Sequence, residues 1–207
     1  MTEKKMQSRG RQRRRELLET ARALLKEREM QKLTLPDIAS AAGIPRASAY
    51  HFFADVQDVF HAVAEAVEAE LLAYQEAVAK VEASDWRQIV AAYVRSGAEF
   101  FRQNYDAAQL LIGPHTPAIV KLSDRKSDVL LANQLLGMVS DRFVIPEIND
   151  PEGKFYHAIE IADLFFGLSV MRCGEISDEY ENEAVSASIA YLSIYIPPVL
   201  MSLSRPT

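Results

Sequence analysis

The side chains best suited to chemistry lie in one short stretch, Arg46–His51. A guanidinium such as that of Arg46 can form two hydrogen bonds with guanine O6 and N7. The hydroxyl of Ser48 can reach a base or a phosphate, and that of Tyr50 can reach a phosphate. Ala47 leaves room for close approach, and His51 lies one residue beyond Tyr50. The pattern favours DNA contact with Arg46 as the base reader, although short helix pairs of this kind also occur in proteins that never meet DNA.

Two short helices, 35–42 and 45–52, are expected to position these residues. Thr34 precedes the first helix with Asp37 three residues on, an acidic form of the capping box. Gly43 allows the sharp bend between the helices, and Pro45 suits the first turn of the second. In a DNA-binding helix-turn-helix the second helix enters the major groove, so we count Thr34 among the DNA-binding candidates.

A run of five arginines precedes this motif, at positions 9, 11, 13, 14 and 15. Such runs are often only solvated tails. Beside a helix-turn-helix, however, a flexible arm carrying Arg13 and Arg14 can bind phosphates or the minor groove. Residues 1–50 hold 12 Lys and Arg against 6 Asp and Glu, whereas the whole chain has a net charge of −6. The sequence therefore predicts a basic head on an acidic body.

Other chemistries lack a sequence signature. Cys173 is the one cysteine, which excludes an intrachain disulfide and a multi-cysteine zinc site and fits a cytoplasmic protein. The glycines form no G-x-G pair and no G-x-S-x-G turn. His61 alone has an acidic residue, Asp58, three positions before it, and a di-iron bundle needs two such pairs. We expect no enzyme activity, no cofactor and no metal, although a catalytic site assembled from distant residues stays an alternative.

Helical periodicity continues through the rest of the chain, and prolines mark its breaks. The uncharged run 184–204 is long enough to span a bilayer, but its serines and Pro197-Pro198 favour a buried helix with a kink, and no membrane contact. We expect a loop over 145–153. The fold is predicted to be all-α, with about nine helices over 11–29, 35–42, 45–52, 55–83, 85–101, 105–112, 118–143, 154–174 and 178–202.

The segment Leu17–Val63 resembles the DNA-binding domain of the TetR family of bacterial regulators. The resemblance is carried by Thr-x-x-x-Ile-Ala-x-x-Ala-Gly over 34–43, followed by Tyr50 and Phe53. It implies a homodimer that binds double-stranded DNA, an interface built from the last two helices, and a small-molecule pocket in the larger domain. Three positions depart from the family pattern. Pro45 replaces a serine-like cap, Ala49 replaces a leucine, and Val56 replaces a lysine that grips a phosphate.

The chain is accordingly divided into an N-terminal helix-turn-helix domain, 1–54, and a ligand-binding and dimerisation domain, 55–207, connected by the helix 55–83. Excess apolar residues in 154–174 and 178–202 favour pairing with a second copy. The pocket is expected among the middle helices and is predicted to favour an apolar or aromatic molecule. Its predicted lining is aromatic or sulfur-containing with two polar anchors: Trp86, Tyr93, Phe100, Phe101, Met138, Phe165, Phe166, Arg95 and His115.

The sequence thus predicts a ligand-responsive transcriptional regulator, a repressor that binds a palindromic operator as a homodimer and is released by its effector. An all-helical small-molecule-binding or stress protein without DNA binding is the alternative.

Overall fold

The computed structural model describes residues 2–77 and 82–203. Over these residues the chain forms nine α-helices and no strand, apart from one isolated bridge between Phe143 and Ser202, which confirms the all-α prediction. The helices are α1 Thr2–Glu27, α2 Leu35–Ala41, α3 Arg46–Phe52, α4 Val56–Glu76, α5 Trp86–Gln103, α6 Tyr105–Ala107, α7 Ala118–Ser140, α8 Pro151–Cys173 and α9 Asp178–Leu192, with a 3-10 turn η1 Met30–Lys32 and a π-helical turn η3 Ala108–Ile112.

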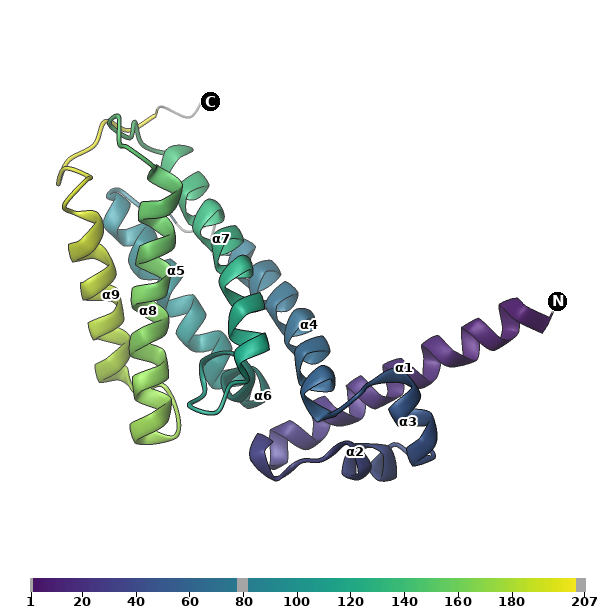
Figure 1. Cartoon of the computed structure of the whole chain (residues 1–207). Coiled ribbons are helices and arrows are strands. Elements are labelled where there is room, and N and C mark those ends of the chain that lie inside the picture. The colour runs from purple at the N-terminus through teal and green to yellow at the C-terminus, as the bar shows by residue number, and fades with distance from the viewer. Residues whose placement is uncertain (1, 78–81, 204–207) are drawn as a thin grey trace.

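Helices α1–α3 form a small head at one end of the molecule, and α4 leads from it into the body (Figure 1). Leu17, Ala21 and Leu25 of α1 are buried together with Ile38 of α2 and Ala49 of α3. Gly43 adopts φ +64° between α2 and α3, a left-handed conformation that glycine accepts without strain. The predicted caps Asp55 and Asp85 open α4 and α5 by accepting backbone N–H hydrogen bonds.

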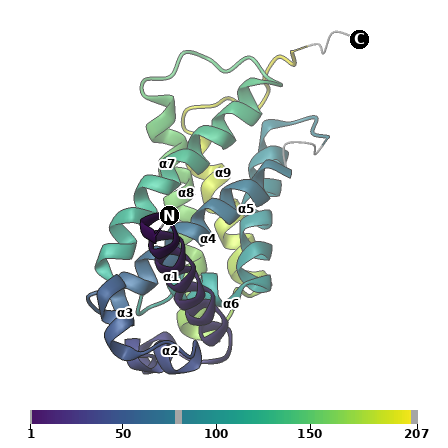
Figure 2. The same ribbon diagram turned by 90° about the vertical axis from the view of Figure 1, so that its right-hand side faces the viewer.

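The expectation of a flexible arginine arm is wrong. Helix α1 begins at Thr2, so the arginines belong to a helix that runs out from the head (Figure 1), and Figure 2 shows this helix from its N-terminal end. The segment has no proline, and its Lys, Gln, Arg and Glu residues favour helix. Gly10, the one residue that disfavours a helix here, faces the ring of Phe52, to which an added Cβ would lie 3.8 Å away.

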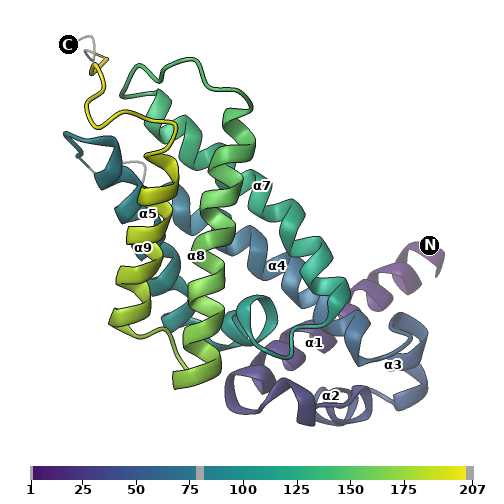
Figure 3. The same ribbon diagram turned by 60° about the vertical axis from the view of Figure 1, so that its left-hand side comes forward.

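The body is a bundle in which α8 lies between α7 and α9 (Figures 1 and 3). Helix α4 packs on α7 and α5, and α5 packs on α9. The predicted fourth helix, 55–83, includes residues 78–81, which lie outside the described residues, and the helix as described ends at Glu76. The predicted 105–112 helix is divided into α6 and the π-helical turn η3.

The last helix ends earlier than predicted, at Leu192 instead of residue 202, and it does not continue through a kink. Pro197 and Pro198 have no N–H to donate, and each restricts the residue before it. The chain then turns back along the end of α7. Val144 N donates to Met201 O (2.9 Å), and Leu203 N donates to Arg142 O (2.8 Å). The indole of Trp86 donates to Pro197 O (3.0 Å) and fixes this segment from the side of α5.

Helix α8 begins at Pro151, within the predicted 145–153 loop. Asp150 accepts a hydrogen bond from Gly153 N (3.1 Å) as the N-cap, and proline fits the first helical position because it lacks an N–H. None of the helices described here is both long and apolar enough to cross a membrane.

Candidate DNA-binding face and ligand cavity

Helix α3 presents the predicted DNA-binding side chains on one exposed surface. Arg46, Ala47, Tyr50 and His51 are exposed, and Ser48 is half-buried. Ala49, on the opposite side, is completely buried against the rest of the head. A methyl group fits this close packing, which explains how alanine replaces the leucine of the family pattern. The side chains that could read bases therefore remain free of the head's own core.

Thr34 lies at the start of α2, and its side chain forms the predicted capping box. The Thr34 hydroxyl donates to Asp37 Oδ2 (2.5 Å) and accepts from Asp37 N (3.3 Å), while Thr34 N donates to the same carboxylate (3.1 Å). These hydrogen bonds from Thr34 lower the pKa of Asp37. Thr34 thus acts first as a helix cap, from an exposed position at the edge of the motif.

The arginine-bearing part of α1 lies beside α3. The guanidinium of Arg14 stacks over the ring of Phe53, 5.2 Å from its centre, at the end of α3. Arg13 is exposed on the same helix. Since α1 is helical here, these cations have a fixed direction relative to α3. In the sequence, Arg14 only precedes the helix-turn-helix motif, whereas in the folded protein it contacts the end of α3.

A polar junction joins the head to the body. Arg22 of α1 donates through Nε to Asp106 Oδ2 (2.6 Å) and through its two terminal nitrogens to both carboxylate oxygens of Glu70 (2.5 and 2.7 Å). Asp106 is fully buried, and its Oδ1 has no hydrogen-bond partner. The hydrogen bond and charge of Arg22 lower the pKa of Glu70. Arg22 is consequently the group that neutralises a buried carboxylate between the two parts.

Gln109, on the turn η3, makes a second connection to the head. Its Nε2 donates to Leu25 O (2.6 Å) and Arg28 O (3.0 Å), and its Oε1 accepts from Met30 N (2.8 Å). The side chain therefore satisfies backbone groups in the last turn of α1 and just after it. Gln109 therefore links η3 to the end of α1 through three hydrogen bonds.

Most of the predicted ligand-lining residues belong to the packed core. Phe100, Phe101 and Phe166 form a chain of ring contacts with centroids 5.8 and 6.2 Å apart, and Trp86 and Met138 are buried elsewhere in the core. A cavity of only about 20 Å³ is lined in part by Tyr93, Phe101 and Phe166. Phe165 is half-buried against the core. Because this cavity is about the size of one water molecule, these residues leave little room for a ligand.

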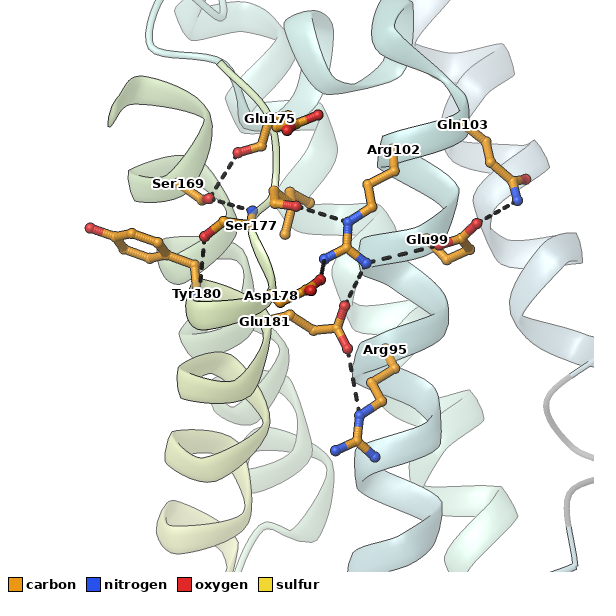
Figure 4. Close-up of polar contacts among 11 residues, drawn as sticks. Arg95, Glu99, Arg102, Gln103, Ser169, Glu175, Ser177, Asp178, Tyr180 and Glu181 are labelled. Atoms are coloured by element: carbon orange, nitrogen blue, oxygen red, sulfur yellow. Dashed lines mark hydrogen bonds and ion pairs between the residues drawn. The ribbon is translucent and has the colours of Figure 1, made fainter. Parts of the chain in front are cut away.

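The two predicted polar anchors have other surroundings. Arg95 is exposed and pairs with Glu181 (3.5 Å), which also accepts from Arg102 (2.6 Å) (Figure 4). Arg102 reaches Ile176 O and Asp178 as well, so this network holds α5 against the start of α9. His115 is exposed and lines a cavity of about 160 Å³ beside residues 29–31 of the head.

A cavity of about 340 Å³ lies between η3, α7 and α8, and we call it the α7–α8 cavity. None of the predicted lining residues belongs to it. One wall is apolar, and the others carry carboxylates and two cations: Leu111, Ile112, Gly113, Pro114, Lys121, Arg125, Asp128, Glu160, Asp163, Leu164, Gly167, Leu168 and Met171. Its volume is within the range of small-molecule sites, roughly 300–1,000 Å³. The turn that contains Gln109 thus also supplies part of the cavity wall.

Asp128 is the unusual group of this cavity, because it is 96% buried and makes no hydrogen bond or ion pair with a described residue. Burial, followed by the charges of Asp163, Glu160 and Glu68, raises its pKa to about 9. The sequence contained a signal for this position, since Asp128 falls on the helical stripe of Leu131, Ala132 and Leu135. A carboxylate on a core-facing stripe needs a partner.

Residues 17–63 match the family model for bacterial regulatory proteins of the tetR family. Solved structures give the same result for the fold of nearly the whole chain. A TetR-family transcriptional regulator from Streptomyces coelicolor superposes with a TM-score of 0.67 at 18% identity, covering 89% of this chain and 99% of that one. A TetR regulator from Rhodococcus sp. RHA1 gives 0.61 at 17% identity, covering 90% and 97%. No curated protein matches this sequence.

A third similar structure is RolR in complex with resorcinol, with a TM-score of 0.63 at 18% identity and 88% of each chain covered. The resemblance inferred from Thr34–Phe53 is therefore confirmed. The chain has a TetR-type N-terminal domain and the fold of a TetR-family transcriptional regulator. Regulators of this family are generally not enzymes.

Proposed function

We propose that this protein is a ligand-responsive transcriptional regulator that binds a palindromic operator as a homodimer and acts as a repressor. The observation that carries the proposal is the surface of α3, where Arg46, Ala47, Tyr50 and His51 are exposed while Ala49 is buried in the head. An exposed recognition helix with a guanidinium near its start matches the way helix-turn-helix proteins read the major groove. Such a protein works on DNA, so we propose a cytoplasmic location.

Arg13 and Arg14 contribute phosphate contacts in this proposal. They lie on a helix rather than a flexible arm, and the stacking of Arg14 over Phe53 places that cation at the end of α3. They supply positive charge beside the recognition helix where Val56 replaces the family's phosphate-binding lysine. Phosphate contacts position the protein on the duplex, whereas Arg46 supplies base specificity.

The proposed dimer forms through α8, α9 and the segment that follows, 193–202. These elements expose large apolar side chains, with Leu164 60%, Met171 56% and Ile194 71% accessible. Exposed apolar surface of this kind favours association. A twofold dimer places two α3 helices on half-sites about 34–36 Å apart or a multiple of this distance.

Ligand response is proposed to use the connection between the α7–α8 cavity and the head. Leu111 and Ile112 line the cavity, and Gln109, on the same turn, binds the backbone at the end of α1. A ligand that displaces η3 therefore changes how the head is held. An effector with an apolar or aromatic body suits the apolar wall formed by Leu111, Leu164 and Leu168.

Selection of bound duplexes from random-sequence DNA tests the proposal. The expected result is an imperfect palindrome whose affinity falls steeply with salt, with a log–log slope of about −0.9 for each phosphate neutralised. Light scattering should give the mass of a dimer in the same buffer. Recovery of no preferred sequence would support the alternative, a helical binding protein without a DNA site.

A further inference from the structure

The distribution of charge in the α7–α8 cavity separates buried carboxylates from exposed cations. Asp128 is 96% buried, and Asp163 lines both this cavity and the small aromatic cavity of about 20 Å³ next to it. Glu68 of α4 is 91% buried, and its Oε1 has no partner, whereas its Oε2 accepts from Ser127 (2.5 Å). Asp128 and Asp163 therefore make one side of the cavity acidic, and Glu68, which is not a lining residue, adds to the negative charge around Asp128.

The two cations of the cavity are at its exposed side. The side chain of Arg125 is 65% exposed and lies 3.7 Å from Glu160, and Lys121 is exposed. Neither approaches Asp128 within ion-pairing distance. An anionic ligand beside Asp128 would meet a second carboxylate, that of Asp163, in the lining of the same cavity. The buried positions therefore select for positive charge.

A buried carboxylate that has no hydrogen-bond or ion-pair partner among the described residues is expensive to maintain, because burial without such a partner costs free energy. An apolar residue at 128 would pack the same helix stripe more stably. The described residues include no group of three or more His, Cys, Asp or Glu side chains arranged to hold a metal ion. The missing counter-ion is accordingly better supplied by a molecule with its own apolar surface than by a bare metal ion.

We propose that the α7–α8 cavity binds an organic cation, a small molecule with an apolar or aromatic body whose ammonium group is held by Asp128 and the neighbouring carboxylates. The apolar wall of Leu111, Leu164 and Leu168 receives the body of the molecule. The identification of this ligand as the effector rests on the proposed function, but binding in the cavity does not.

Protonation of Asp128 gives the proposal a second signature. Burial and the carboxylates of Asp163, Glu160 and Glu68 raise the pKa of Asp128 to about 9, while Arg125 acts in the opposite direction. Burial and the neighbouring carboxylates therefore favour the protonated form of Asp128 in the free protein, which allows the group to stay buried until a cation binds. An incoming ammonium favours the ionised carboxylate and expels that proton.

The remaining titratable groups around Asp128 do not compete for this role. On α5, burial raises the pKa of Tyr93, whose hydroxyl donates to Gln134 Oε1 (2.7 Å). On α8, burial and the hydrogen bond to Glu160 raise the pKa of Tyr156 to about 12. Both phenols therefore stay neutral at pH 7. Release of a proton on binding would thus come from the carboxylates.

Calorimetric titration of the full chain with three matched probes tests the proposal. The probes are 1-naphthylmethylamine, 1-naphthylmethanol and 1-naphthoate, which share a ring system and differ in charge. We expect the amine to bind at least about tenfold more tightly than the alcohol, equivalent to about 1.4 kcal/mol, and the acid to bind most weakly. Comparison of phosphate and Tris buffers should show proton release with the amine and none with the alcohol.

The variant Asp128→Asn should bring the amine-to-alcohol affinity ratio close to one. The control Asp141→Asn, an exposed change at the C-cap of the same helix, should leave the ratio unchanged. Equal or tighter binding of the alcohol or the acid, no binding of any probe at about 5 mM, or an Asp128→Asn variant that keeps the preference would each overturn the proposal. If Asp128→Asn does not fold, the number of protons that the wild-type protein releases on binding the amine decides the matter: release supports the proposal, and no release overturns it.

The titrations contain no DNA, so their outcome is separate from that of the proposed function. If the protein binds the amine but selects no DNA sequence, the proposed regulator function is rejected and the cation site is retained. If the protein selects an operator but does not bind the amine, the regulator function is retained and the cation site is rejected.

Discussion

Replacement of Arg22 tests how the head is fastened to the body. In Arg22→Ala, the fully buried Asp106 loses its one hydrogen-bond donor among the described residues, and the half-exposed Glu70 loses a two-point contact. Breaking a buried charge pair from one side costs roughly 3–5 kcal/mol. Arg22 is itself 25% exposed, and an exposed partner such as Glu70 adds at most about 1 kcal/mol, so we expect the lower end, about 3 kcal/mol.

A loss of this size is a large part of the usual stability of a domain, roughly 5–15 kcal/mol. For a chain of this length it should lower the melting temperature by roughly 6–12 °C in a calorimetric or circular-dichroism melt. Lys32→Ala is the control, because it removes an exposed pair with Glu29 in the same head and should cost at most about 0.5 kcal/mol.

The two partners, Arg22 and Asp106, should differ in the stability lost when each is replaced. Asp106→Ala should cost less than Arg22→Ala, because Arg22 keeps both hydrogen bonds to Glu70. Adding Asp106→Ala to the Arg22→Ala protein should restore stability, with a coupling energy of about 2 kcal/mol. A loss below about 1 kcal/mol for Arg22→Ala, or a double variant less stable than either single one, would refute the assignment of a buried, unpaired charge.

Four further outcomes are expected. Arg46→Ala should relax base preference at one position of each half-site at a cost of about 1–3 kcal/mol, and an unchanged selected sequence would reject it as the base reader. Ile194→Glu should convert a dimer to a monomer in light scattering, whereas Leu122→Glu, a similarly exposed apolar position on α7, should not. Gln109→Ala removes the acceptor of the Met30 N–H, so amide exchange there should be about tenfold faster, and equal protection would contradict this contact. The native pKa of Asp128 exceeds its unfolded value, so the native protein binds more protons than the unfolded chain between about pH 4 and 9. The free energy of unfolding of the wild-type protein should therefore fall as pH rises through this range, by up to about 1.4 kcal/mol per pH unit, and the fall should be smaller in Asp128→Asn. Equal pH profiles for the two proteins would exclude Asp128 as the source of the pH dependence.

The sequence was sufficient for the elements whose cause is local. The capping box at Thr34, the caps Asp55 and Asp85, and the turn at Gly43 each depend on residues within four positions of one another. Their hydrogen bonds form wherever those residues occur. Helical periodicity likewise predicted the all-α class, and the Thr34–Phe53 pattern identified the TetR-type N-terminal domain.

Local patterns were insufficient where a distant segment decided the outcome. Helix α1 extends through the arginine run, and folding sets Gly10 beside Phe52 and Arg14 over Phe53, contacts that no neighbouring residue reveals. Helix α9 ends at Leu192, and beyond Pro197-Pro198 the backbone of Met201 and Leu203 pairs instead with Val144 and Arg142. In both cases the sequence predicted a helix at the right place in the chain, but it placed one end of that helix wrongly.

The ligand site shows the same division most clearly. From sequence, the aromatic residues of α5 and α8 looked like a pocket lining, but packing decides whether aromatic rings surround a space or fill it, and Phe100, Phe101 and Phe166 fill it. The sequence by itself determined that Asp128 falls on a core-facing stripe. Only the tertiary structure placed Glu68 and Asp163, from two other helices, close enough to raise its pKa, because a cavity and its field belong to the packing of helices and not to any one of them.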